Sequence, residues 1–154
     1  MESPTRGEIP VRQKALALLA RREHSIRELS RKLVARGIQA ELVRTAVSRL
    51  RGEGLVSDAR FTETFVGQRM AKGVGPIRIR RELRERGVDD ATITRYLPRD
   101  EEIWLDSIAR VRRKRFGAGR PVDAGERARQ MRFLAYRGFD SEQIRHHFAS
   151  QDDD

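Results

Sequence analysis

Three stretches of the sequence share one pattern: LVARGIQAELVRTAV at residues 33–47, LRERGVDDATITRYL at residues 83–97 and LAYRGFDSEQIRHHF at residues 134–148. Aligned on their Arg-Gly pairs, the copies are offset by 50 and 51 residues, and four apolar columns coincide around the glycine. Self-similarity at a fixed period indicates an internal repeat, in which each copy is one small structural unit. The sequence therefore predicts three copies of a helical unit rather than one large domain.

Each column of the alignment predicts a local feature. The glycine marks the end of a helix, because the left-handed conformation at that position favours glycine, and the apolar residue after it packs back on the helix. Asp89 or Asp90 in the second copy, and Asp140 or Ser141 in the third, are expected to cap the next helix. In the first copy, Gln39 offers only a weak cap. The last helix of each copy then presents apolar residues at i and i+4, the spacing of one helical face.

A further helix precedes each Arg-Gly helix. In the first copy it is expected over residues 11–22. The helix that follows is predicted to be capped by Ser25, with Glu28 three residues later completing a capping box.

The second and third copies contain the same three elements. In the second, a helix is expected to begin at Ser57 or Asp58, and Pro76 suits the first position of the next helix. In the third, a long first helix is followed by a loop over residues 117–125, and a helix resumes over residues 126–137. The chain is therefore expected to form nine helices.

These elements predict an all-α fold of three tandem three-helix repeats, each similar to a helix-turn-helix unit. Small helical units that stack in a row cover one another's apolar edges, so we expect an elongated, curved array. The expected segments are a disordered tail (1–9), three repeats (10–56, 57–98 and 99–149) and an acidic tail (150–154).

The composition favours several shallow cores and an anionic partner. Apolar residues make up 38% of the chain and charged residues 36%, which is too polar for one deep core. The formal net charge of +10 favours nucleic acid or an acidic protein surface as the partner. No apolar run approaches the roughly 20 residues of a membrane span, and the first residues lack the apolar stretch of a signal peptide. A cytoplasmic location without membrane association is expected.

The sequence offers no pattern typical of a catalytic site. It contains no glycine-rich phosphate loop, no HExxH motif and no cysteine. The adjacent His146 and His147 diverge by about 100° on a helix, so they do not form a pair of metal ligands. We therefore expect no enzyme activity, no cofactor and no metal site.

Clusters of basic residues are the stronger functional signal. Residues 78–86 hold five arginines in about two helical turns, although Glu82 and Glu85 leave open the interpretation of a solvated charged face. Residues 110–115 hold five cations without an acidic residue, and a third group follows after residue 126. Such clusters suit contacts to phosphate or to acidic protein. Aromatic residues do not alternate with them, so base stacking is not indicated.

An alternative interpretation comes from the first repeat. The stretch SIRELSRKLVARGIQAELVRTAVSRLRGEGLV at residues 25–56 resembles the helix-turn-helix and following strand of winged-helix repressors. In that case the helix that carries Arg44, Ser48 and Arg49 would enter the major groove of DNA. A DNA-binding transcriptional regulator therefore stays open as the second hypothesis.

The stretch GLVSDARFTETFVGQRMAKGVGPIRIRRELRERGV at residues 54–88 resembles the RecX family, regulators of the RecA recombinase. The resemblance covers about residues 14–148, and its only departures in this stretch are Val56 and Thr62. The matching residues are Ser25, Glu28-Leu29, Lys32-Leu33, Gly37, Leu55, Asp58-Ala59-Arg60-Phe61, Lys72-Gly73, Gly75-Pro76, Ile79, Glu82-Leu83, Gly87, Lys114-Arg115-Phe116-Gly117, Glu126-Arg127-Ala128-Arg129-Gln130, Arg132-Phe133-Leu134 and Arg137-Gly138-Phe139.

The resemblance implies a modulator, mainly negative, of RecA. It would bind in the groove of the RecA–single-stranded DNA filament and limit filament extension, ATP hydrolysis, strand exchange and coprotease activity. The chain is expected to be a monomer that binds free DNA weakly.

The candidate contact residues toward the filament are all basic. An ion pair between Asp58 and Arg60 that shapes the turn is an equally open reading of Arg60. The candidates are Arg60, Arg78, Arg80, Arg81, Arg84, Arg112, Arg113, Lys114, Arg115, Arg127 and Arg129.

Overall fold

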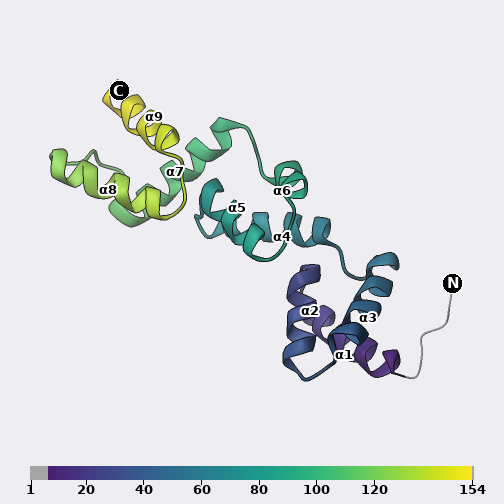
Figure 1. Ribbon diagram of the computed structural model, residues 1–154. Helices are drawn as coiled ribbons and strands as arrows, with labels where there is room; N and C mark the ends of the chain where they lie inside the picture. Colours follow the sequence, from purple (N-terminus) through teal and green to yellow (C-terminus); the bar gives the residue numbers. More distant parts are fainter. Residues whose placement is uncertain (1–6, 154) are drawn as a thin grey trace. The chain divides into compact units, whose positions relative to one another are not determined.

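The computed structural model of the protein describes residues 7–153 (Figure 1). Within these residues the secondary structure consists of nine helices and no strand. The predicted all-α fold of three tandem three-helix units is confirmed. The helices are α1 (Glu8–Arg21), α2 (Ile26–Ala35), α3 (Ala40–Gly52), α4 (Asp58–Ala71), α5 (Pro76–Glu85), α6 (Asp90–Tyr96), α7 (Glu101–Phe116), α8 (Ala124–Tyr136) and α9 (Ser141–Asp152).

The three Arg-Gly turns have one geometry. Gly37, Gly87 and Gly138 have φ angles of 89°, 80° and 101°, the left-handed region predicted from the sequence. The N–H of the next residue reaches back five positions to the carbonyl of the aligned leucine, at 3.4, 3.1 and 3.2 Å. This is the hydrogen bond of a Schellman turn, which satisfies carbonyls at the end of the helix.

The predicted helix caps are also present. The Ser25 hydroxyl accepts from the Glu28 N–H at 3.1 Å, and the Glu28 carboxylate accepts from the Ser25 N–H at 3.2 Å, which completes the capping box. Of the two alternatives in each later copy, Asp89 caps α6 and Asp140 caps α9. Gln39 makes no side-chain cap, as expected. Each cap stabilises its helix by about 1 kcal/mol.

The ends of the chain are more helical than the sequence predicts. Helix α1 starts at Glu8 rather than at the expected Val11, because the Glu8 carboxylate is buried and pairs with Arg49 at 3.2 Å. Helix α9 runs to Asp152, whose carboxylate accepts a hydrogen bond from Arg127 at 2.9 Å. Part of both expected tails is therefore helical, while residues 1–6 and 154 lie outside the described residues.

The loop before α8 is shorter than expected. Helix α8 begins at Ala124 rather than at Glu126, because the Asp123 carboxylate accepts from the Glu126 N–H at 2.8 Å and caps the helix there. As a result, α8 has 13 residues, whereas α2 and α5 have 10 each. The third Arg-Gly helix is thus about one turn longer at its start.

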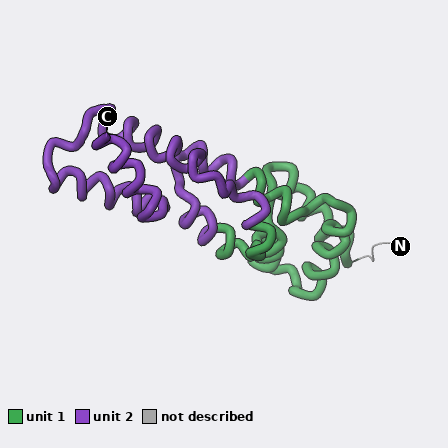
Figure 2. Tube along the Cα trace, turned by 90° about the horizontal axis from the view of Figure 1, so that it is seen from above, with its two compact units in different colours: residues 1–64, 83–93 green, residues 65–82, 94–154 purple. Residues whose placement is uncertain are grey.

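Contacts divide the chain into two compact units, and α4, α5 and α6 contribute to both (Figure 2). Unit 1 comprises residues 1–64 and 83–93, and unit 2 comprises residues 65–82 and 94–154. Each contains its own buried apolar side chains. In unit 1 these include Leu29, Leu33 and Leu50, and in unit 2 they include Trp104 and Ile108.

Within unit 1, the start of α2 lies against the Arg-Gly turn of the second copy. The Ser25 hydroxyl donates to the Arg86 carbonyl oxygen at 2.8 Å. The Ile26 N–H donates to the Asp58 carboxylate at 2.8 Å. A Cβ atom on Gly87 would lie 2.6 Å from Nε of Arg27, so the glycine also permits a close approach.

Within unit 2, the start of α5 lies against the Arg-Gly turn of the third copy in the same way. The Gly75 N–H donates to the Arg137 carbonyl oxygen at 2.9 Å, and the Ile77 N–H donates to the Gly138 carbonyl oxygen at 3.0 Å. A Cβ atom on Gly75 would collide with the backbone of Gly138 and Phe139. In the second and third copies, the Arg-Gly pair therefore ends one helix and also contacts the start of a helix from the preceding repeat.

Candidate anion-binding site

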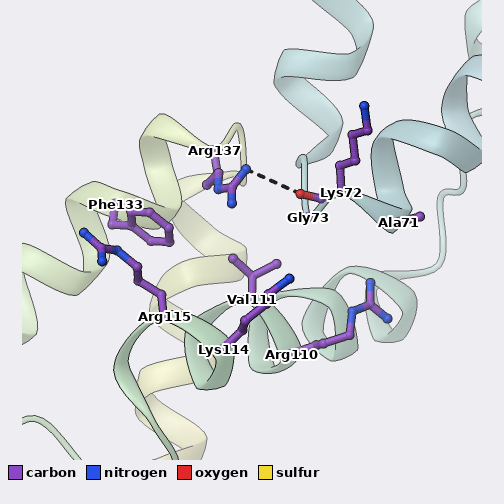
Figure 3. A pocket seen from close by; sticks show the side chains of 9 residues that line it. All are labelled: Ala71, Lys72, Gly73, Arg110, Val111, Lys114, Arg115, Phe133 and Arg137. Carbon is purple, nitrogen blue, oxygen red and sulfur yellow. Dashed lines mark hydrogen bonds between the residues drawn. The ribbon is translucent and has the colours of Figure 1, made fainter.

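A cationic pocket of about 320 Å³ lies in unit 2, between the end of α4 and the facing sides of α7 and α8 (Figure 3). We refer to it as the α7–α8 pocket. Five of its residues are basic and none is acidic. The lining residues are Ala71, Lys72, Gly73, Arg110, Val111, Lys114, Arg115, Phe133 and Arg137.

Helical spacing on α7 creates one wall of the pocket. Lys114 follows Arg110 by four residues and Val111 by three, so all three lie along one side of the helix. Val111 is buried, and a Cβ atom on Gly73 would lie 2.8 Å from its Cγ2 atom. This close approach, at a glycine with φ of 80°, brings the end of α4 to the rim of the pocket.

Two of the arginines are held in place by neutral acceptors. Arg137 donates from Nη1 to the Lys72 carbonyl oxygen at 3.4 Å, the bond drawn in Figure 3. Arg110 donates from Nη2 to the Met70 carbonyl oxygen at 3.5 Å and to the Ser107 hydroxyl at 3.4 Å. These bonds are long, and a guanidinium carries five N–H groups, so most of its donors stay available.

An aromatic side chain supports the other wall. The guanidinium groups of Arg115 and Arg137 lie 5.6 and 5.5 Å from the centre of the Phe133 ring. Phe133 in turn packs edge-on against Phe116, with ring centres 5.3 Å apart. Cation–π contacts orient the guanidinium groups without neutralising them.

The charge of the α7–α8 pocket is not compensated by ion pairs in the described part of the chain. In residues 7–153, no carboxylate forms an ion pair with Lys72, Arg110, Lys114, Arg115 or Arg137. Arginine stays protonated at any physiological pH. The pocket therefore attracts anions, and it has the geometry to donate several hydrogen bonds to one of them.

Most other predicted contact residues differ from the pocket because carboxylates compensate them. Arg80 donates to the Thr94 hydroxyl at 3.4 Å. The ion pairs are Arg60 with Glu23 (2.5 Å), Arg78 with Glu82 (3.0 Å), Arg84 with Asp90 (2.7 Å), Arg127 with Asp152 (2.9 Å) and Arg129 with Glu126 (3.4 Å).

The cluster at residues 78–86 fits the alternative interpretation of a charged helix face. Glu82 accepts hydrogen bonds from Arg69 at 2.7 Å and from Arg78 at 3.0 Å. Burial alone would raise the pKa of Glu82, but the bonds from Arg69 and Arg78 outweigh it and lower the pKa. The carboxylate is thus ionised at neutral pH and neutralises part of the cluster. Arg81 is exposed and has no ion pair in the described part of the chain.

Arg112 does not fit the predicted contact role. Its side chain is only 2% exposed. It donates to the Gln130 amide oxygen at 2.8 Å and to the Gly119 carbonyl oxygen at 2.6 Å, and it lies 5.3 Å from the Phe148 ring centre. Arg112 therefore fixes the loop before α8 to the helices of unit 2, and we remove it from the contact set. Its neighbour Arg113 is exposed and lies outside the pocket.

The suggested ion pair between Asp58 and Arg60 is wrong. The Asp58 carboxylate accepts from the Ile26 N–H, and Arg60 pairs with Glu23. Arg60 also donates to the Gly54 carbonyl oxygen at 2.9 Å, so it shapes the turn through the backbone instead.

Sequence reasoning identified part of the pocket. Lys114 and Arg115 were predicted contact residues, and Arg110 belongs to the same basic run. Lys72, Phe133 and Arg137 lie in stretches that match the RecX family, but they are not among the predicted contact residues. The charge of Arg137 could have identified it as a binding residue, because the glycine that follows is sufficient to end the helix and needs no arginine before it.

Two further observations concern the described residues. No helix among them is long and apolar enough to cross a bilayer. No three His, Cys, Asp or Glu side chains among them are grouped to hold a metal ion.

Comparison with known proteins identifies the three helical units. The family profiles for the first, second and third three-helix domains of RecX match residues 12–50, 57–97 and 101–147. The regulatory protein RecX of Halorhodospira halophila is 47% identical over 144 residues, which cover 94% of this chain and 89% of that protein. The regulatory protein RecX of Pseudomonas fluorescens is 44% identical over 146 residues, which cover 95% of this chain and 94% of that protein.

A solved structure has the same fold. The crystal structure of RecX from Lactobacillus salivarius superposes with a TM-score of 0.81 at 18% identity, over 95% of this chain and 97% of that one. The three matched domains follow the order of the three helical units, and the similarity extends over nearly the full length of both chains. The protein that carries this cationic pocket therefore belongs to the RecX family of regulatory proteins.

Proposed function

We propose that this protein modulates the RecA recombinase, mainly negatively, by binding in the groove of the RecA–single-stranded DNA filament. Binding there limits filament extension, and with it ATP hydrolysis, strand exchange and coprotease activity. The observation that carries the proposal is the α7–α8 pocket, in which five cations have no carboxylate partner among the described residues. Family membership supports a regulatory role, and the chemistry of the pocket suggests the kind of surface it meets.

The charge distribution supports a filament partner in physical terms. A filament groove exposes DNA phosphate, and each phosphate neutralised by a lysine or arginine steepens the dependence of log K on log salt by about 0.7 for a single strand. Three pocket cations bound to phosphate would therefore contribute about 2 to the slope. The net charge of +10 also speeds association with a polyanion.

The proposed mechanism needs no catalytic group. A protein that binds one state of a filament more tightly than another shifts the population toward the bound state. The magnitude of the shift equals the difference between the two binding free energies. Regulation of RecA then follows from differential binding alone, and free DNA is bound more weakly than the filament.

The alternative of a winged-helix regulator finds less support. After α3 the chain turns at Gly54, with φ of 74°, and enters α4 without forming a strand, so the described residues provide no wing. Of the proposed base-reading residues, Arg49 pairs with Glu8 at 3.2 Å. Its side chain is thus engaged inside the first repeat.

The test is inhibition of RecA ATP hydrolysis on single-stranded DNA by a pocket variant, Arg110→Gln/Lys114→Gln/Arg115→Gln. The matched control is Lys14→Gln/Arg31→Gln/Arg44→Gln, which removes the same charges from exposed positions of α1, α2 and α3. We expect the pocket variant to need at least about ten times more protein for half-maximal inhibition, which corresponds to about 1.4 kcal/mol of lost binding. For the control variant, the concentration for half-maximal inhibition should change far less.

Binding of each variant to RecA filaments, to RecA alone and to DNA alone, measured at one salt concentration, separates the contributions. Equal inhibition by the pocket variant and the control, with both folded by circular dichroism, would show that only net charge matters. Tight, sequence-selective binding to a duplex, with no affinity for RecA filaments, would favour the winged-helix alternative.

A further inference from the structure

A second cationic pocket lies in the first repeat, within unit 1, between α1 and α2. It has a volume of about 500 Å³, and we refer to it as the α1–α2 pocket. Four of its residues are lysine or arginine and none is acidic. The lining residues are Leu18, Arg21, Arg22, His24, Lys32, Ala35 and Arg36.

The internal repeat shows that the two pockets are equivalent places in two copies of one unit. The aligned helices carry a buried apolar residue followed by cations three and four positions later, and the same Arg-Gly turn. The corresponding pairs are Leu18 and Val111, Arg21 and Lys114, Arg22 and Arg115, Lys32 and Phe133, and Arg36 and Arg137.

In the third repeat this place is partly occupied by the preceding repeat. The end of α4 reaches the α7–α8 pocket through Lys72 and Gly73, and Gly75 donates to the Arg137 carbonyl oxygen. Within residues 7–153, no segment occupies the equivalent place in the first repeat. A Cβ atom on Gly37 would meet no atom within 4 Å, whereas one on Gly138 would collide with Arg78. The turn that ends α2 is therefore open.

The first repeat, where no preceding repeat of the described chain fills the place beside the Arg-Gly turn, also carries a different type of residue there. The aligned α2, α5 and α8 positions are Lys32, Glu82 and Phe133. Glu82 is enclosed in ion pairs with Arg69 and Arg78, and Phe133 packs against arginines. Only the first repeat places a cation there.

Lys32 is oriented by a buried histidine. His24 is 1% exposed, and its Nδ1 atom lies 2.9 Å from the Arg22 carbonyl oxygen, which places the ring proton on Nδ1. The His24 Nε2 atom therefore accepts from the Lys32 ammonium, at 2.8 Å. Burial lowers the pKa of His24 and of Lys32, and each also lies near other cations. Two N–H groups of the ammonium remain for a ligand.

The surrounding charges leave the pocket cationic. Arg22 pairs with Glu28 at 3.1 Å, and Glu28 also lies 4.0 Å from Arg86. Arg21 and Arg36 have no carboxylate partner in residues 7–153. An anion in the pocket would therefore be attracted by Arg21, Lys32 and Arg36 together.

The third repeat of a second copy does not supply the missing occupant. Gly75, whose N–H makes the junction in unit 2, aligns with Glu126 in the third repeat. The extra turn of α8 places Glu126 inside the helix, where its N–H already donates to Asp123 at 2.8 Å. That N–H is not free to bond to the Arg36 carbonyl oxygen of another chain.

We propose that the α1–α2 pocket binds a phosphate group. A phosphate dianion has several acceptor oxygens, which match the forked donors of two arginines and the two free N–H groups of Lys32. A single carboxylate would satisfy fewer of these donors. A free phosphoryl compound offers such a dianion, and a nucleic-acid backbone offers a series of phosphodiester monoanions with the same type of acceptor oxygen. The proposal is independent of the function proposed for the α7–α8 pocket.

The test is titration of the isotope-labelled full-length protein with inorganic pyrophosphate at constant ionic strength, followed by NMR. We expect saturable shifts of the backbone amides of residues 35–38 and of the His24 ring nitrogens. Arg21→Gln/Arg36→Gln should weaken this binding at least tenfold. The control Lys14→Gln/Arg31→Gln, which removes two exposed charges from the same helices outside the pocket, should leave it unchanged.

A thymidine oligonucleotide and poly-glutamate distinguish the sources of the anion. Saturation by pyrophosphate alone assigns the pocket to free phosphoryl compounds, and tighter binding of the oligonucleotide assigns it to a nucleic-acid backbone. Poly-glutamate that binds the same residues more tightly than either would replace phosphate with an acidic protein surface. The proposal is overturned if neither phosphate probe shifts these signals at about 10 mM, where a site with a dissociation constant of ~1 mM would be filled. The proposal is also overturned if Lys14→Gln/Arg31→Gln weakens pyrophosphate binding as much as Arg21→Gln/Arg36→Gln does.

Discussion

Gly75→Ala tests the junction that joins the second and third repeats within unit 2. The added Cβ would fall on the backbone of Gly138 and Phe139. A side chain in the way could rotate aside, whereas a backbone that also holds two junction hydrogen bonds has to move as a whole. Gly75 does not have a positive φ angle, so the effect of the substitution is steric rather than conformational.

The expected loss of stability follows from these contacts. Overpacking typically costs about 1–3 kcal/mol. If the two backbone segments move apart, the hydrogen bonds donated by the Gly75 and Ile77 N–H groups are also weakened. Each such bond contributes about 0.5–1.5 kcal/mol to stability. We therefore expect Gly75→Ala to lower the free energy of unfolding by about 2–6 kcal/mol, which corresponds to a decrease in Tm of about 5–20 °C for a chain of this length.

Urea denaturation followed by circular dichroism measures this loss, and Gly67→Ala provides the matched control. Gly67 lies inside α4, and a Cβ atom there would meet no atom within 4 Å. Alanine at a helical position should stabilise the protein by about 0.5–1 kcal/mol. If Gly75→Ala were as stable as Gly67→Ala, the close backbone approach would not exist in solution.

Three further predictions concern buried or capping groups. Arg112→Met removes the hydrogen-bond donor of the buried Gln130 amide oxygen and of the Gly119 carbonyl oxygen, and it should lower the free energy of unfolding by about 2–4 kcal/mol. Arg113→Met, at an exposed position, should change it by less than ~0.5 kcal/mol, and chemical denaturation measures both. Ser25→Ala removes the α2 cap and a junction hydrogen bond and should cost about 1–2 kcal/mol by the same assay, of which Ser25→Asp, which retains a capping oxygen, should recover part. Burial lowers the pKa of His24 and of His147, so the unfolded chain binds more protons than the folded chain as the pH falls below the ordinary value of 6.5. The stability present above pH 6.5 should therefore decrease as the pH falls through the folded pKa values, and a free energy of unfolding that stays constant over this range would contradict the burial of both rings.

The predicted contact residues show where sequence reasoning ended. Arg112 and Lys114 stand in the same basic run, yet one is buried against Gln130 and the other lines a pocket. Helical periodicity gives the direction of each side chain relative to its neighbours on the helix, but it does not say which direction faces the rest of the protein. That depends on α8 and α9, which follow after a loop.

The sequence by itself determined most of the local structure: the nine helices of residues 7–153, the three glycine turns that end a helix, and the Ser25 capping box. These features depend on hydrogen bonds between residues at most five positions apart, so the residue types in each window suffice to specify them. Before α6 and before α9 the sequence left two candidate caps open. Only the tertiary structure decided which cations are compensated and which line the two pockets. Arg137 meets the Lys72 carbonyl oxygen across 65 residues, and Arg60 meets Glu23 across 37. The packing of whole helices determines such partners, because electrostatic interactions depend on distance in space and not on separation along the chain.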